Sequence, residues 1–502
     1  MIFKSIMNWA MKKRIHQIEL FQKYPHDVQN EWLFKLLDTA KNTEWGKRYD
    51  FSSVNSRQTF QERIPLTTYE ELFPDIDRLM KGEGNILWPS KVEWFAKSSG
   101  TTNAKSKFIP VSSEALEDCH FKGGKDMLSI YVNNYPMRDL FDGKGLSIGG
   151  SHGSFPENRK VQFGDVSAVI MANLPIWAQF MRTPSLKVAL MEEWEAKIAK
   201  MIEETEGENV TSLSGVPTWT LVLIQKILEK HGKKNLLEIW PNLELFAHGA
   251  VSFDPYRELF KELIPSSSMN YLEIYNASEG FFGIQDEPDK HEMLLMLDYG
   301  IYYEFIPMDE IDEENPTVLT LDQVELNHNY AMVITTNAGL WRYKIGDTVR
   351  FTSVDPYRIR ITGRTKHFIN AFGEELIIEN AEDAIRYACH HTDSVITNFT
   401  AAPIYFEGKS RGGHQWLIEF EKPPKDLEYF NYALDKRLKE VNSDYEAKRY
   451  KDIALQAPEI RALPKGTFYK WMERRGKLGG QNKVPRLSNS REYVDDLLEM
   501  LA

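Results

Sequence analysis

Short apolar runs alternate with segments of helical spacing along most of the chain. In the first 45 residues, apolar positions such as Leu33, Leu36 and Leu37 recur at the spacing that predicts helices. From Trp94 onward, short apolar runs typical of strands occur at 145–148, 243–247, 293–297, 302–306 and 332–335. Between them lie segments of helical periodicity, 185–202 and 217–229. The alternation predicts an α/β fold in which packed β-sheets are flanked by helices.

The pattern changes near residues 363–367, which follow two further strand-like runs, 341–351 and 357–362. The segments after this point predict, in order, a helix at 379–391, strands at 394–400 and 414–421, a long helix at 427–448 and a final helix at 490–501. This set is large enough to fold as a small α+β domain. We therefore predict a large N-terminal domain, residues 1–365, and a small mobile C-terminal domain, residues 366–502. Segment 463–486, rich in Lys, Arg and Gly, is predicted to be a long surface loop.

Composition narrows the class of protein. The chain has 502 residues, of which 42% are hydrophobic and 27% charged, and no apolar run approaches the ~18 residues of a membrane span. The N-terminus lacks the compact apolar run of a signal peptide, and two cysteines, Cys119 and Cys389, are too few for a disulfide framework. We therefore expect a cytoplasmic protein that does not act at a membrane. A net charge of -12 argues against general nucleic-acid binding, so any anion must meet a local cationic site.

The richest chemical signal is a loop of hydroxyl residues around one glycine, Ser98-Ser99-Gly100-Thr101-Thr102, followed by Lys105 and Lys107. Hydroxyls, free backbone N–H groups and lysines together suit a polyphosphate. The alternative is a solvated Ser/Thr turn. The loop is not a Walker A sequence, because the G-x-x-x-x-G-K-[ST] spacing is absent.

Two further segments place a carboxylate at the end of a strand-like run. In Tyr275-Asn276-Ala277-Ser278-Glu279, the carboxylate suits Mg²⁺ and the aromatic ring suits a purine, although for this segment alone an exposed loop Glu is the more common explanation. In Tyr343-Lys344-Ile345-Gly346-Asp347, the Asp after Gly suits two vicinal ribose hydroxyls, and the alternative is an ordinary tight turn.

Two polar segments lie near the predicted boundary and in the basic loop. The first contains Arg364 and Lys366 and could also be a plain linker. The second, Gln481-Asn482-Lys483-Val484-Pro485-Arg486, could also be a solvated charge cluster.

Taken together and in this order, the five segments resemble the acyl-adenylate-forming superfamily. Within it they are most similar to the auxin-responsive Gretchen Hagen family of acyl acid–amido synthetases, of a microbial type. That family has Ser-Ser-Gly-Thr-Thr before a Lys, Tyr-x-x-Ser-Glu, Tyr-Arg-x-Gly-Asp and Gln-x-Lys-x-Pro-Arg in turn. The resemblance covers residues 64–486, most of the chain.

The resemblance implies a site for ATP and Mg²⁺. In it, Ser98, Ser99, Thr101 and Thr102 hold the phosphates, and Tyr275 lies by the adenine. Gly100, Lys107, Asn276 and Ser278 also belong to the nucleotide site. Glu279 holds Mg²⁺ and Asp347 the ribose, while Arg364 and Lys366 lie at the hinge and Lys483 enters from the small domain. The chain departs from the family pattern at Ala104, where a second Gly is usual, and at Lys344, which replaces Arg.

The implied reaction has two halves. A small carboxylic acid attacks the α-phosphorus of ATP and releases pyrophosphate, and then an amine, such as an amino acid, displaces AMP. Glu279 and Lys483 would carry the catalysis. The acyl pocket is not fixed by the sequence, although 172–177 and 214–219 place aromatic residues near turns.

Three alternatives stay open at this point. An acyl-CoA ligase of the same superfamily uses a thiol acceptor, and a non-catalytic ligand-binding relative keeps only the fold. The third is a serine hydrolase, because Gly149-Gly150-Ser151-His152-Gly153 fits the G-x-S-x-G nucleophile elbow. An elbow leads directly into a helix, however, and the residues after Ser151 do not have helical spacing. The twelve histidines show no metal-binding spacing.

Overall fold

The computed structural model describes residues 2–99, 106–288, 290–311, 313–365, 368–405, 412–450, 454–475 and 484–501, without the side chains of 2–10, 12, 99, 106, 177, 194 and 255. Within these residues no helix combines the length and the apolar character needed to cross a bilayer. Gly100, Thr101, Thr102, Lys366 and Lys483 lie outside the described residues, so the roles expected for them stay predictions.

The chain begins with helices, as the spacing of its apolar residues predicts. They are α1 (Ile2–Lys23), α2 (Pro25–Ala40), α3 (Glu44–Arg48), α4 (Arg57–Arg63) and α5 (Tyr69–Met80). Helix α2 buries Leu33, Leu36 and Leu37 against the main core. Helix α1 is held by Arg14, whose guanidinium pairs with Asp126 at 2.6 Å and Asp298 at 2.8 Å in a buried network.

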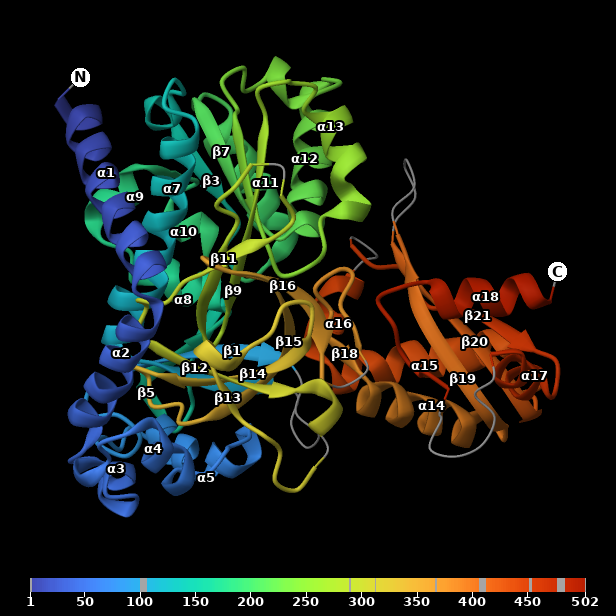
Figure 1. The fold of residues 1–502 in the computed structure, drawn as a ribbon. Helices are drawn as coiled ribbons and strands as arrows, with labels where there is room; N and C mark the ends of the chain where they lie inside the picture. Colours follow the sequence, from blue (N-terminus) through green and yellow to red (C-terminus); the bar gives the residue numbers. More distant parts are fainter. Residues whose placement is uncertain are drawn as a thin grey trace.

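A twelve-stranded sheet forms the centre of the large N-terminal part (Figure 1). Its strand order is β13-β12-β14-β15-β16-β11-β10-β9-β8-β7-β3-β6. The last five strands are parallel, and the others pair antiparallel. The bounds are β3 (Lys144–Ser147), β6 (Arg182–Thr183), β7 (Val210–Gly215), β8 (Leu245–His248), β9 (Asn270–Ala277), β10 (Gly280–Ile284), β11 (Met293–Leu295), β12 (Ile301–Pro307), β13 (Leu319–Thr320), β14 (Asn329–Thr336), β15 (Tyr343–Val354) and β16 (Tyr357–Arg364).

The parallel strands are joined through helices, as the alternating pattern predicts. Helix α12 (Pro217–His231) joins β7 to β8, and α13 (Arg257–Leu263) joins β8 to β9. One part of the chain is more broken than predicted: the expected helix at 185–202 is two helices, α10 (Leu186–Ala189) and α11 (Trp194–Thr205). The break occurs because Glu193 caps α11, its side chain accepting from the N–H groups of Glu195 and Ala196.

A second sheet of four strands lies against the first, in the order β2-β1-β5-β4. Its strands are β1 (Trp94–Ser99), β2 (Ser106–Val111), β4 (His152–Phe155) and β5 (Asn158–Gly164). The helices of this region are α6 (Ser113–Ala115), α7 (Lys122–Asn134), α8 (Val166–Ala172) and α9 (Ile176–Phe180). Strand β4 follows Ser151 directly, so the strand-to-helix turn of a nucleophile elbow is not formed there.

From residue 368 on, the strands join smaller sheets and not the large one. Strands β17 (Phe368–Ile369) and β18 (Leu376–Ile377) form a hairpin, and β19 (Val395–Ile404), β20 (Gly413–Lys422) and β21 (Glu459–Leu463) form a three-stranded sheet. Alternate residues of this sheet enter two cores: Ala401 and Trp416 pack with α14 and α15, and Ala402 and Leu417 with α17 and α18. Figure 1 shows this group beside the larger part of the chain.

The C-terminal helices are α14 (Ile378–Thr392), α15 (Leu427–Val441), α16 (Ser443–Arg449), α17 (Thr467–Arg474) and α18 (Glu492–Met500). Two expectations were wrong. The long helix at 427–448 is divided at Asn442, whose side chain caps α16 by accepting from the N–H of Tyr445 at 2.8 Å. The loop expected at 463–486 contains α17, which buries Phe468 and Trp471. The division at residues 365 and 366 stays a prediction, because residue 366 lies outside the described part.

Candidate active site

The serine-rich segment forms one arm of a hairpin. Strands β1 and β2 pair antiparallel, so that Ser98 lies opposite Lys107 and Ser99 opposite Ser106. The residues expected to turn around a phosphate, 100–105, lie outside the described part of the chain. The Lys107 Nζ lies 5.7 Å from the centre of the Tyr69 ring. The described part of this hairpin therefore brings a lysine and a serine to the same end of the small sheet.

Three of the predicted residues meet on the large sheet. The Tyr275 hydroxyl donates to one carboxylate oxygen of Asp347 at 2.5 Å, and the Arg364 Nε donates to the other at 2.9 Å. Pairing of β15 with β16 sets this geometry, because it places Asp347 opposite Arg364. Burial and the Asp347 carboxylate raise the pKa of the Tyr275 phenol, so Tyr275 stays a donor. Each carboxylate oxygen keeps a lone pair for a further hydroxyl donor.

Glu279 lies in the two-residue turn between β9 and β10. It is close enough to Asp347 and Arg364 for their charges to shift its pKa. Burial raises the pKa of the Glu279 carboxyl from 4.5 to about 7; Asp347 adds to the shift, while Lys107 and Arg364 oppose it. A carboxylate in this setting gains from an added cation, which would return it to the ionised form. The donor set of Glu279 beside Asp347 therefore fits Mg²⁺, whose ligands are oxygens.

The same strand continues into a cavity. Asn276 and Ile274 of β9 line it, and the Asn276 side chain lies 3.2 Å from the His120 Nδ1. Burial lowers the pKa of His120 to about 4, so this imidazole is neutral near pH 7. Strand β9 therefore joins the two places, because its Tyr275 contacts Asp347 and its Asn276 lines the cavity. Ser278 lies beside Glu279 in the turn and is partly exposed.

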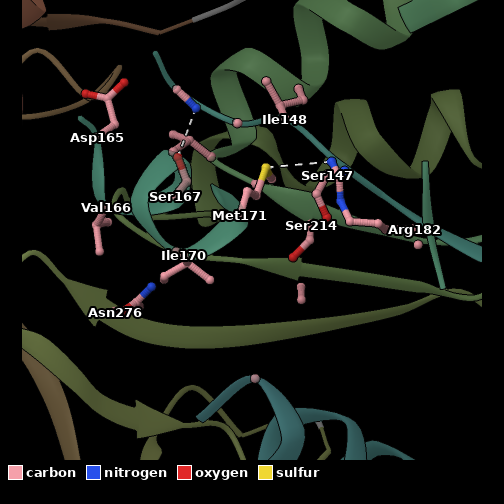
Figure 2. Close-up of a pocket in the computed structure, with 18 of the residues that line it drawn as sticks. Ser147, Ile148, Asp165, Val166, Ser167, Ile170, Met171, Arg182, Ser214 and Asn276 are labelled. Carbon is pink, nitrogen blue, oxygen red and sulfur yellow. Dashed lines mark hydrogen bonds between the residues drawn. The ribbon is translucent and has the colours of Figure 1, made fainter. Parts of the chain in front are cut away.

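The cavity has a volume of about 1070 Å³, which exceeds most sites for small ligands. Figure 2 shows Ser147 of β3, Met171 of α8 and Ser214 of β7 among the side chains that line it, together with Asp165, which directly precedes α8. Both segments suggested for the acyl pocket contribute to the wall: Leu174 and Pro175 from 172–177, and Ser214, Val216 and Trp219 from 214–219. Helix α16 of the C-terminal part adds Asp444 and Lys448.

Several residues of the cavity escaped the sequence analysis. Lys197 of α11 donates to the carbonyl oxygens of Gly149 and Gly150, the latter at 3.3 Å. Burial lowers the pKa of Lys197 to about 8. Asp165 accepts from the N–H of Ser151 at 3.1 Å. The glycine-rich segment 149–153 suggested only a hydrolase elbow. The feature of the sequence that could have indicated a cavity wall is the cluster of small residues from 143 to 151.

Comparison with known proteins decides the family. Models of three GH3 family domains match the chain in order: the N-terminal domain at residues 14–269, the central domain at 294–364 and the C-terminal domain at 379–492. The chain belongs to the GH3 family. The resemblance found in the motifs is thereby confirmed.

Curated GH3 relatives are similar over nearly the full chain. Indole-3-acetic acid-amido synthetase GH3.4 of Arabidopsis thaliana is 24% identical over 94% of this chain and 91% of its own length. Jasmonoyl--L-amino acid synthetase JAR4 of Nicotiana attenuata is 24% identical over 97% and 95%. The relatives are named as amido synthetases or ligases, and this GH3 chain is a ligase of the amido synthetase type.

Solved structures show the same fold. The GH3.15 acyl acid amido synthetase matches with a TM-score of 0.62 at 19% identity, covering 97% of this chain and 95% of its own. A 2-hydroxyisobutyryl-CoA ligase matches with a TM-score of 0.58 at 12% identity, covering 95% and 91%. The α/β fold with a large N-terminal part and a small C-terminal domain is confirmed.

Proposed function

We propose that this GH3 chain adenylates a small carboxylic acid with ATP and Mg²⁺ and then transfers the acyl group to an amino acid. The observation that carries the proposal is the meeting of Tyr275, Glu279, Asp347 and Arg364 beside a cavity of about 1070 Å³. These four residues come from three strands and a turn and lie close together, although up to 89 residues separate them in the sequence. Such convergence is expected of a nucleotide site next to a substrate pocket.

In this proposal Asp347 accepts the ribose hydroxyls while Tyr275 and Arg364 fix its orientation. The hairpin of Ser98, Ser99 and Lys107, with Gly100, Thr101 and Thr102, holds the phosphates, and Asn276 and Ser278 lie by the adenine. Mg²⁺ at Glu279 would neutralise phosphate charge. Lys366 belongs to the hinge, and Lys483 enters the site when the small domain turns. These contacts stabilise the charge that grows as the carboxylate attacks the α-phosphorus.

The amine of the second half-reaction must reach the acyl carbon in its unprotonated form. The relatives' names support an amino acid as acceptor, because they include an L-amino acid synthetase and a glutamate ligase. The fold neighbour that is a CoA ligase supports the second candidate, transfer to a thiol. Rotation of the small domain between the two halves is part of the proposal.

ATP–pyrophosphate exchange tests the first half. With a panel of aryl, indolyl and fatty carboxylates, we expect exchange with at least one acid, and we expect Lys483→Ala to lower it about 10²- to 10³-fold. Lys465→Ala is the matched control, because Lys465 is an exposed lysine of the same domain. Supplying amino acids, hydroxylamine or CoA as acceptor then separates amide from thioester formation. Absence of exchange with every acid would favour a non-catalytic relative.

A further inference from the structure

One end of the cavity is built from three neighbouring parallel strands, β6, β3 and β7. Their register places Arg182 beside Gly145, and Gly145 beside Ser212. Residues in register on parallel strands point to the same face of the sheet. Arg182 and Ser212 therefore share the face that lines the cavity, with a glycine between them.

This face is polar, although the opposite face is apolar. Two residues further along, Ser147 and Ser214 are in register and also line the cavity. On the other face, Leu146 and Leu213 are buried in the core under the sheet. The alternation therefore gives this face three serine hydroxyls and one guanidinium. We call this face, formed by Ser147, Arg182, Ser212 and Ser214, the floor of the cavity. In the described part of the chain, none of the hydroxyls of Ser147, Ser212 and Ser214 has a hydrogen-bond partner.

Gly145 keeps the floor open between Arg182 and Ser212. A Cβ at position 145 would lie 3.0 Å from the Ser212 Oγ, closer than side chains normally approach. The missing side chain leaves a shallow hollow directly beside the guanidinium. A small group of a ligand can enter there and reach both polar side chains.

Among the described residues, Arg182 forms no ion pair. Its Nε is buried without a hydrogen-bond partner, and one terminal nitrogen lies 3.7 Å from the Met171 sulfur, a weak acceptor. Figure 2 shows the guanidinium turned toward Met171. Glu204 contributes charge from a distance, but its carboxylate binds the N–H and hydroxyl of Ser185. Burial lowers the pKa of Arg182.

An unpaired guanidinium inside a protein is costly unless something binds it. The walls around it are largely apolar and include Leu140, Phe141, Met171, Met181 and Met191. Five acidic residues also line the cavity: Asp165, Glu192, Glu193, Asp444 and Glu446. Asp165 accepts from the Ser151 N–H, and Glu193 caps α11. None of the five forms an ion pair with Arg182 in the described residues.

Arg182 lies far from the residues assigned to the nucleotide. Strand β6 is the fourth strand from β9, which carries Tyr275 and Asn276. At about 4.8 Å per strand, this places Arg182 roughly 19 Å from β9 across the sheet. The carboxylate that reacts with ATP belongs near β9, so Arg182 meets the other end of a bound acid.

We propose that Arg182, with the hydroxyls of Ser147, Ser212 and Ser214, binds a second carboxylate at the far end of the acid. The substrate class is then a dicarboxylic acid with an apolar middle, and the inference rests on the function proposed above. A guanidinium matches a carboxylate because its fork of N–H donors meets both oxygens. The apolar walls contact the part of the acid between its two ends.

The test compares dicarboxylic acids of increasing length with their mono-methyl esters, which keep the reacting carboxylate and lose the distal charge. In ATP–pyrophosphate exchange, we expect a KM for the best diacid roughly 10- to 100-fold below that of its ester. Arg182→Met should remove this preference, and Arg182→Lys should restore part of it. Arg386→Met is the matched control, because Arg386 is an exposed arginine of helix α14.

A second readout needs no catalysis. The best diacid should raise the melting temperature of the wild type, and its ester should do so much less; Arg182→Met should abolish the difference. If diacid binding follows this pattern but no acid supports exchange, the adenylation function fails and the carboxylate site stands. If exchange proceeds but favours esters or monoacids, the carboxylate site is wrong. If Arg182→Met changes only the KM of the amino acid acceptor, Arg182 belongs to the acceptor and the inference also fails.

Discussion

At the scale of single residues, the site depends on charges held in contact with one another. Asp347 is fixed from both sides, by Tyr275 and by Arg364, so its orientation is set before any ligand binds. Glu279 is different, because the cations near it do not outweigh its burial, and its pKa rises to about 7. The Glu279 carboxyl is therefore partly protonated near neutral pH, and it lies in the turn that follows β9.

This difference predicts a pH-dependent effect of Glu279→Gln. Since the folded pKa lies above 4.5, the native state holds an extra proton between about pH 4.5 and 7, and stability falls as pH rises through that window. Glutamine cannot ionise. The variant should match the wild type in free energy of unfolding at pH 4.5 and exceed it by about 1–3 kcal/mol above pH 7.

Urea unfolding at pH 4.5, 6 and 8 measures this gain. Glu258→Gln, at an exposed position of α13, is the control and should show no such trend. A difference between Glu279→Gln and the wild type that stays constant from pH 5 to 8 contradicts the assignment. In exchange assays the same variant should lose most activity, because the proposed Mg²⁺ ligand is gone.

At the scale of elements, capping side chains determine where helices end and which of their residues reach the cavity. The sequence pattern is amphipathic from 427 to 448, yet Asn442 divides it. Its side-chain oxygen accepts from the Tyr445 N–H, and its amide donates to the Glu375 carbonyl at 3.1 Å. The bend aims α16 at the cavity, where a continuous helix would have carried Lys448 elsewhere.

Asn442→Ala should therefore lower the free energy of unfolding by about 1–3 kcal/mol, through loss of the cap and of the bond to Glu375. The comparison is Asp426→Ala, which removes the exposed cap of α15 and should cost about 1 kcal/mol. Chemical denaturation monitored by circular dichroism gives both values. Equal losses for the two variants would show that the buried bonds of Asn442 contribute nothing beyond an ordinary cap.

At the scale of the whole molecule, the cavity is shared between the two parts of the chain. Its floor comes from the large sheet and part of its wall from α16. Hydrogen bonds cross between the parts: the Tyr256 hydroxyl donates to the Ala371 carbonyl at 2.6 Å, and Thr218 to that of Phe372 at 3.2 Å. The Lys448 ammonium lies 4.4 Å from the centre of the Trp219 ring. Any turn of the small domain must exchange these contacts for others.

The proposed rotation predicts that two lysines of the small domain serve different half-reactions. Lys448→Met should slow transfer from a supplied acyl-adenylate about tenfold, since a buried cation over Trp219 is lost, and should leave pyrophosphate exchange nearly unchanged. Lys483→Ala should slow pyrophosphate exchange and leave transfer from a supplied acyl-adenylate nearly unchanged. Single-turnover assays of each half separate the effects. Loss of the same half-reaction in both variants would contradict a rotation between them.

Much of this protein could be predicted from its sequence. The apolar spacing predicted the helices at the start, most strands of the large sheet and the α+β character of the last 130 residues, because local periodicity reflects which face is buried. The five polar segments predicted the family, because their order is a property of the chain alone. The breaks at Glu193 and Asn442 were missed, since a single capping side chain hardly alters a periodic pattern.

The tertiary structure alone decided what surrounds each group. Asp347 and Arg364 were expected at one site, but their direct contact follows from the pairing of β15 with β16. Arg182 carries no motif, and only the register of β6, β3 and β7 places it on the same face as a row of serines, with no ion pair among the described residues. Sequence determines which residues can do chemistry. Burial and neighbouring charge depend on contacts between distant segments, so only the folded chain determines which of them do.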